Sequence, residues 1–171
     1  MGWRRAVAVG GLLIGLALIA YAVLARQTDD ERIRAQLHRL AEAVSFTKPG
    51  NAVTRGLALK GAFRDIFDKT IRAEIPELGS PRTSRNALVE LGLQSTRFAR
   101  SLSLSFAGVD VDVDPNRTTA TAEATVTVRA VTHEGDDRQD DRSVRFVFVR
   151  TDDGWKIARF RVTPADEEPS P

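Results

Sequence analysis

The spacing of hydrophobic residues changes twice along this chain. Residues 6–25 contain no charged side chain, residues 29–100 place apolar side chains three and four positions apart, and residues 101–163 alternate apolar with polar ones. A period near 3.6 is typical of helices that face a core, and a period of two is typical of half-buried strands. The pattern predicts an α+β domain, in which about three helices pack on the concave face of a curved antiparallel sheet.

The helical part is expected to contain one well-defined helix and two weaker ones. Thr28 or Asp29 supplies an N-cap for the first, and Ser80-Pro81 is a typical start for the third. A short strand is expected between the second and third helices. In chain order these elements cover residues 29–44 (helix), 59–67 (helix), 70–75 (strand) and 80–100 (helix).

The alternating part predicts a meander of four antiparallel strands. Asp152-Asp153-Gly154 is a strong signal for a tight turn, and an earlier turn is expected at residues 114–117. We interpret residues 133–141 as a solvated hairpin tip. The expected strands cover residues 101–113, 119–132, 142–151 and 155–163.

The first of these strands contains a change of register. Its apolar residues occupy even positions up to Phe106 and odd positions from Val109 onward. Side chains alternate strictly along a regular strand, so both sets reach the core only if an extra residue intervenes. We therefore predict a bulge near Ala107-Gly108, which would curl the sheet.

The uncharged run at residues 6–25 is long enough to cross a bilayer as a helix. Arg4 and Arg5 precede it, and the positive-inside rule then places the rest of the chain outside the cytoplasm. The alternative is a cleaved secretory signal, although the apolar part of such signals is usually shorter. We divide the chain into a cytoplasmic stub and membrane anchor (1–27), one domain (28–164) and a disordered acidic tail (165–171).

Composition narrows the possible partners and chemistry. The chain has 25 Lys and Arg against 23 Asp and Glu, and because Arg4 and Arg5 precede the anchor, the exported part is neutral. Neutrality argues against nucleic acid as a partner. The chain has no cysteine, which excludes disulfides, thiolate zinc sites, thiol nucleophiles and a lipoprotein lipidated at cysteine.

The order of the elements carries a family resemblance. Helices, a short strand between them, and a curled meander ending in DGWKIARFRVTP resemble the nuclear transport factor 2-like, or SnoaL-like, cone fold over residues 28–164. This family includes isomerases, dehydratases, epoxide hydrolases and binding or scaffold domains, so the resemblance implies a fold and no single function. With its N-terminal anchor, the chain is also similar to inner-membrane scaffold proteins of type IV secretion and to Mce-associated proteins of actinobacterial lipid importers.

The catalytic patterns of that family are only partly represented. The ketosteroid isomerase pattern needs a pocket tyrosine, and the one tyrosine is Tyr21, inside the anchor. His38 is expected on the surface of the first helix. His133 and the aspartates after it form either a hairpin tip or a cation site. Asp110, Asp112 and Asp114 share one strand face and form either an exposed strand end or a cation site. Epoxide-hydrolase sites, built from Asp and Arg, stay open. We assign no catalytic residue, metal ligand or cofactor.

Two functions remain at this stage. The first is a membrane-anchored, extracytoplasmic binding or scaffold domain of an envelope or transport assembly, with protein partners or a second copy of itself. The second is a small-molecule enzyme or carrier that uses the apolar cone pocket.

A partner interface is predicted on the convex sheet face. Setting Thr151 opposite Trp155 places an apolar patch there beside a row of arginines, and related cone domains often dimerise through this face. Exposed apolar patches mark interfaces, and adjacent like charges need an anionic partner. The alternatives are a cover formed by the tail after Pro164, or a different register. The residues are Val131, Val147, Val149, Trp155, Ile157, Arg129, Arg145 and Arg161.

Overall fold

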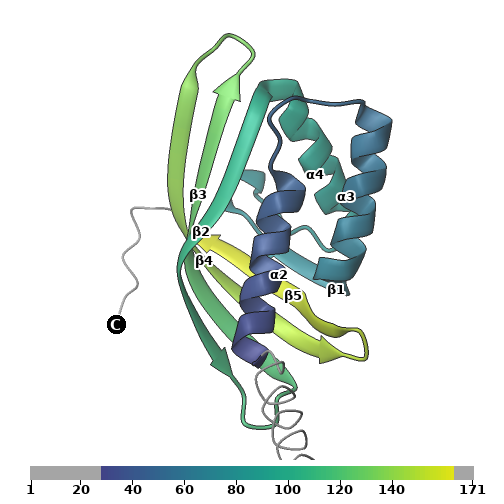
Figure 1. Ribbon diagram of the computed structural model, residues 1–171, viewed down its shortest axis with the longest axis vertical. Helices are drawn as coiled ribbons and strands as arrows, with labels where there is room; N and C mark the ends of the chain where they lie inside the picture. Colours follow the sequence, from purple (N-terminus) through teal and green to yellow (C-terminus); the bar gives the residue numbers. More distant parts are fainter. Residues whose placement is uncertain (1–27, 164–171) are drawn as a thin grey trace, which may run out of the picture.

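The structure is a computed structural model and describes residues 28–163. Its helices pack on one face of the sheet (Figure 1), and α3 leads into β1, as α4 leads into β2, with no residue between them. The elements are α2 (Asp29–Val44), α3 (Ala52–Ile66), β1 (Phe67–Glu74), the 3-10 helix η1 (Pro76–Leu78), α4 (Arg85–Phe98), β2 (Ala99–Val113), β3 (Thr119–Thr132), β4 (Asp137–Thr151) and β5 (Gly154–Thr163).

The sheet has five strands in the order β1-β5-β4-β3-β2, and it is mixed. The antiparallel meander from β2 to β5 is confirmed. The prediction of a wholly antiparallel sheet is wrong, because β1 pairs with β5 in parallel. No hairpin joins these two strands, since α4 and three strands lie between them in the chain, so the constraint that makes neighbouring strands antiparallel is absent.

Helix α2 has the predicted bounds and begins with a capping box. The Thr28 hydroxyl accepts from the Glu31 amide at 3.2 Å, and the Glu31 carboxylate accepts from the Thr28 amide at 2.9 Å. Its apolar stripe is buried through Ile33 and Leu37, which belong to the hydrophobic core. A side chain of this kind stabilises the fold by about 1.5–3 kcal/mol when fully buried.

Asp29 attaches the start of α2 to two turns of the sheet. Its Oδ1 accepts from Trp155 Nε1 at 3.1 Å and from Arg150 Nη1 at 2.9 Å, both in the β4–β5 hairpin. Arg117, in the β2–β3 turn, lies 3.9 Å from Oδ2. The Trp155 hydrogen bond, together with the two guanidinium groups, holds the pKa of Asp29 below its usual value against the opposing effect of burial.

The predicted bulge in β2 is confirmed. Ala107 pairs with Thr125 and Asp110 with Glu123, so two residues of β2 oppose one of β3. Gly108 has a φ of 60°, the left-handed conformation that glycine adopts at the first position of such a bulge. The bulge also frees the Val109 carbonyl, which accepts from Arg34 of α2 at 2.6 Å.

A second bulge, in β5, was not predicted. Thr151 pairs with Gly154, so the turn is one residue tighter than expected, and Phe148 pairs with Ile157. The register then shifts by one residue, and Arg145 pairs with Arg161 as predicted. The two ends of the β4–β5 pair therefore follow different registers.

Several predicted boundaries are wrong. The second helix, expected from Leu59, begins at Ala52, capped by Asn51. The helix expected from Ser80 begins at Arg85, capped by Ser84, because residues 76–78 form η1 and Arg82 bridges Ala73 in an extended conformation. Strand β4 begins at Asp137, because residues 137–141 continue the ladder with β3. Phe67, expected in the second helix, opens β1.

Some predictions fall outside the described residues, namely the anchor with Arg4, Arg5 and Tyr21, and the tail at 165–171. Within residues 28–163, no helix is both long and apolar enough to cross a membrane.

The bulge can be tested at Gly108. Gly108→Val should lower the free energy of unfolding by about 1 kcal/mol or more, because a β-branched side chain is strained at this positive φ. No heavy atom lies within 4 Å of the added Cβ, so a loss reflects the backbone and not a clash. Thermal unfolding followed by circular dichroism measures it, with Ala107→Val as the control; equal melting temperatures would argue against a strained position.

The attachment of α2 can be tested at Asp29. A carboxyl whose pKa is lowered in the folded protein stabilises the fold at pH values above its unfolded pKa of about 4, and this contribution is lost as the pH falls. Asp29→Asn should therefore cost about 2 kcal/mol at pH 7, and the difference from the unsubstituted chain should shrink below pH 4. Asp30→Asn, at a more exposed ion pair, is the control. A difference that is constant with pH would contradict this role.

Candidate functional site

An apolar cavity of about 370 Å³ lies between the helices and the concave face of the sheet. It is formed by the C-terminal half of α2, by α3, α4 and η1, and by residues of all five strands. This volume falls within the range of small-molecule sites. Much of the wall is aromatic, contributed by Phe63, Phe67, Phe106, Phe146 and Phe160.

Charged groups line one part of this cavity. Asp140 and Arg142 lie on β4, two residues apart and therefore on the same face, and Glu77 lies on η1. Arg142 Nε donates to Asp140 Oδ2 at 2.8 Å, and its Nη1 lies 3.3 Å from Glu77 Oε1. The side chains of Glu77 and Asp140 are more than half exposed, and that of Arg142 is 24% exposed. The three residues, which we call the mouth cluster, therefore stand where the cavity meets solvent.

The histidines considered in the sequence do not reach the cavity wall. His38 is exposed on α2, with Nδ1 3.5 Å from Glu42. His133 Nε2 lies 3.2 Å from the Thr96 carbonyl near the end of α4, so it connects the β3–β4 hairpin to that helix. Neither forms part of an acid–base pair within the cone.

The three aspartates at the end of β2 do not converge. Asp114 turns into its own loop, where its carboxylate accepts from the amides of Asn116, Thr118 and Thr119. These hydrogen bonds hold the pKa of Asp114 far below its usual range. Within residues 28–163, no group of three His, Asp or Glu side chains is arranged to hold a metal ion.

The predicted convex patch is wrong at Trp155 and Ile157. Both side chains are almost fully buried, because the tighter β4–β5 turn rotates this end of β5 toward the helices. Val131, Val147 and Val149 alternate with the inward-facing residues and stay on the convex face, where each is partly exposed. Whether this face binds a partner stays a prediction.

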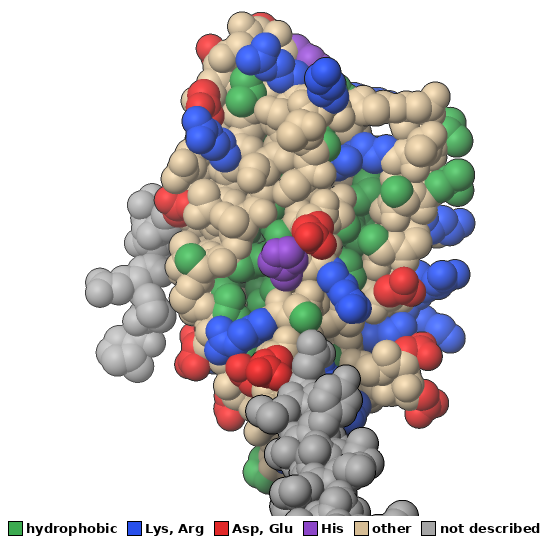
Figure 2. Space-filling model, viewed as in Figure 1, with side chains coloured by type: hydrophobic (Ala, Val, Ile, Leu, Met, Phe, Trp, Pro, Cys, Tyr) green, Lys and Arg blue, Asp and Glu red, His purple; other side chains and the backbone are tan. Residues whose placement is uncertain are grey.

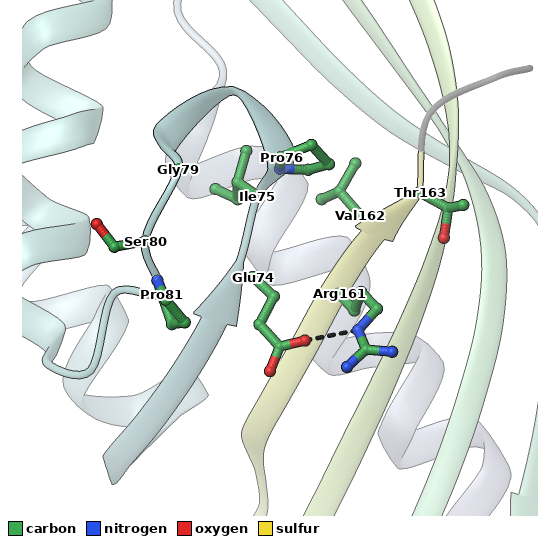
Figure 3. Close-up of a pocket in the computed structure, with 9 residues that line it drawn as sticks. All are labelled: Glu74, Ile75, Pro76, Gly79, Ser80, Pro81, Arg161, Val162 and Thr163. Atoms are coloured by element: carbon green, nitrogen blue, oxygen red, sulfur yellow. Dashed lines mark hydrogen bonds and ion pairs between the residues drawn. The ribbon is translucent and has the colours of Figure 1, made fainter. Parts of the chain in front are cut away.

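The predicted row of arginines is wrong at Arg129, whereas Arg145 and Arg161 pair as predicted. Arg129 pairs with Gln139 in the ladder and not with Arg145. Each arginine of the set has an acidic partner within the domain: Asp137 for Arg129, Glu123 for Arg145 and Glu74 for Arg161. The last pair connects β1 to β5, as Figure 3 shows, beside a shallow pocket of about 350 Å³. Each of the three arginines that were expected to need an outside partner therefore has an acidic partner inside the domain.

The helical side has its own exposed apolar residues. Figure 2 shows charges of both signs across this side, with basic side chains along the edge formed by α3 and hydrophobic ones protruding where α3 begins. Val53, Leu57 and Phe98, at the facing ends of α3 and α4, are each at least 68% exposed.

A model of the SnoaL-like domain matches residues 57–161. The chain belongs to the SnoaL-like domain family. A search of curated proteins by sequence finds no match.

Solved structures share the fold at low sequence identity. Kfla4162 from Kribbella flavida is 17% identical, with a TM-score of 0.65 over 82% of this chain and 93% of its own. A nuclear transport factor 2-like protein from Salmonella enterica is 16% identical, with a TM-score of 0.64 over 82% and 94%. Rv3472 from Mycobacterium tuberculosis is 20% identical, with a TM-score of 0.60 over 77% and 69%. These likenesses establish the nuclear transport factor 2-like fold.

Sequence reasoning missed the mouth cluster. Asp140 was assigned to the hairpin tip and Arg142 to the first position of a strand. Arg138, Asp140 and Arg142 alternate along the chain, but the residues between them are also polar. Such a segment is typical of a strand end exposed to solvent, so it gave no sign of a cavity wall. Glu77, sixty-five residues before Arg142, joins them only through the tertiary fold.

Proposed function

We propose that this chain is a membrane-anchored, extracytoplasmic binding domain of an envelope or transport assembly, and that its cone holds an apolar small molecule. The observation that carries the proposal is the aromatic-walled cavity of about 370 Å³. A cavity that its own side chains do not fill exposes apolar surface to water. An apolar ligand would cover this surface, and covering it is favourable. The uncharged run at residues 6–25, with Arg4 and Arg5 before it, supports the anchor and its orientation.

Protein partners of the envelope, or a second copy of the chain, belong to the same proposal. Four arginines (Arg72, Arg145, Arg159 and Arg161) lie on adjacent positions of the convex face, and the carboxylates among them are Glu74 and Glu123. This excess of positive charge favours contact with an acidic protein surface.

The enzyme alternative is favoured by one observation, the composition of the mouth cluster. A guanidinium between two carboxylates has the residue types that epoxide-hydrolase sites of this fold use. We place binding first because Glu77 and Asp140 are more than half exposed, whereas catalytic charges act most strongly in sites that exclude water.

The anchor and its orientation are tested by labelling single cysteines in intact cells. The natural chain has no cysteine, so a single cysteine at Ser103, exposed on β2, should react with a membrane-impermeant maleimide, whereas Gly2→Cys should not. N-terminal sequencing of the mature chain completes the test. A chain that begins near Val23 or Arg26 would show a cleaved signal instead.

The ligand is tested by extraction. The full-length chain, purified from membranes in mild detergent, should release an apolar compound into organic solvent, detected by mass spectrometry. Val128→Trp fills the cavity from β3 and should abolish this release, whereas Val131→Trp, on the opposite face of the same strand, should not. Release that is equal from both variants would place the compound elsewhere. The proteins that copurify identify the partners.

The enzyme alternative is tested with an apolar epoxide. Formation of a diol by the purified chain, lost in Asp140→Asn and kept in Glu123→Gln on the convex face, would establish hydrolysis at the mouth cluster. Under our proposal, the diol forms no faster with the purified chain than in its absence.

A further inference from the structure

The mouth cluster limits which end group an apolar ligand can carry, an inference that rests on the proposed function. The cluster contains one guanidinium and two carboxylates, so its formal charge is negative. Arg142 is already engaged by both acids, at 2.8 Å from Asp140 and 3.3 Å from Glu77. Ser95, another polar residue of the wall, donates its hydroxyl to the Gly92 carbonyl within α4.

A ligand carboxylate would be unfavourable at this position. A carboxylate placed beside Arg142 would also lie beside Asp140 and Glu77, and both of these acids would repel it. Among residues 28–163, the rest of the wall supplies no second cation, since the other lining residues are apolar, glycine or serine. An anion would therefore face two carboxylates for one guanidinium.

A hydrogen-bond donor on the ligand would be favourable at the same position. An ionised carboxylate accepts through two oxygens and has no proton to give, and each acid uses only part of that capacity on Arg142. An ammonium group would also relieve the negative charge of the cluster, and a hydroxyl or amide N–H would bind without a charge. Both acids are partly exposed, so they remain accessible from the cavity mouth.

We infer that the cone takes an apolar molecule that ends in a cationic or neutral hydrogen-bond-donor group, seated against Glu77 and Asp140, and discriminates against fatty acids and other apolar carboxylates. The aromatic wall binds the apolar body, and the mouth cluster selects the end group.

The test is photoaffinity labelling of the full-length chain in its native membranes. Three probes share one medium-length alkyl chain with a diazirine at one end, and carry an amine, a hydroxyl or a carboxylate at the other. Labelled peptides of α4, β3 and β4 are quantified by mass spectrometry. We expect the amine and the hydroxyl probes to label these peptides about tenfold more than the carboxylate probe, the scale of one hydrogen bond to a charged group.

Variants of the acids separate recognition from simple partitioning. Glu77→Gln, on the exposed η1, should reduce the preference for the amine over the carboxylate, and the further change Asp140→Asn should remove it. Glu123→Gln, which removes a carboxylate from the convex face, should leave it unchanged. A preference that survives Glu77→Gln and the double substitution overturns the inference, and circular dichroism of each variant confirms that it is folded.

The outcomes distinguish this inference from the proposed function. Equal or stronger labelling by the carboxylate probe, removed by Val128→Trp, overturns the end-group preference and leaves the cone as a ligand site. Labelling of the cone peptides by none of the probes, or labelling that Val128→Trp does not reduce, overturns both.

Discussion

The cone depends on breaking the strict alternation of side chains in two strands. A regular strand sends every second side chain to the same face, so an uninterrupted β2 would expose either the residues before Phe106 or those after Val109. The extra residue at Gly108 brings both sets to the core and bends the strand, and the shift after Ile157 does the same in β5. Curvature leaves space between sheet and helices that a flat sheet would close. The cavity is therefore a result of two single-residue irregularities.

The two ends of the cone are stabilised in different ways. At the closed end, Ile33, Leu37 and Trp155 fill the space, and Asp29 connects α2 to the neighbouring turns through charged hydrogen bonds. At the open end, the mouth cluster and the contact of His133 with α4 join the helical layer to the sheet, beside a backbone bridge between Phe46 and Leu102. Fully buried packing gives a rigid base, whereas exposed ion pairs contribute little to stability. The open end is thus the part of the domain that is least costly to rearrange around a ligand.

The sequence was most informative where local chemistry decides the structure. Thr28 with Glu31 specifies the start of α2, and the exchange of parity around Gly108 specifies the β2 bulge. Prediction from the sequence failed where the pairing of segments distant in the chain decides the structure. A tight turn containing Asp152-Asp153-Gly154 is compatible with two registers that differ by one residue, and the choice moved Trp155 and Ile157 from the predicted surface to the core. The mouth cluster joins η1 to β4, a contact that no periodicity encodes.

The absence of any residue between α3 and β1, and again between α4 and β2, has a consequence for how the length of this domain can vary. A residue inserted in α4 rotates the rest of that helix by about 100° about its axis. If the insertion also shifts β2 by one residue, the side chains on the two faces of that strand are exchanged. Neither junction contains a loop to absorb the change, and the Asp114 turn is closed by its own hydrogen bonds. Insertions and deletions among relatives of this chain should therefore collect at the β3–β4 hairpin tip and in the segment between α2 and α3, while the two helix-to-strand passages keep a constant length.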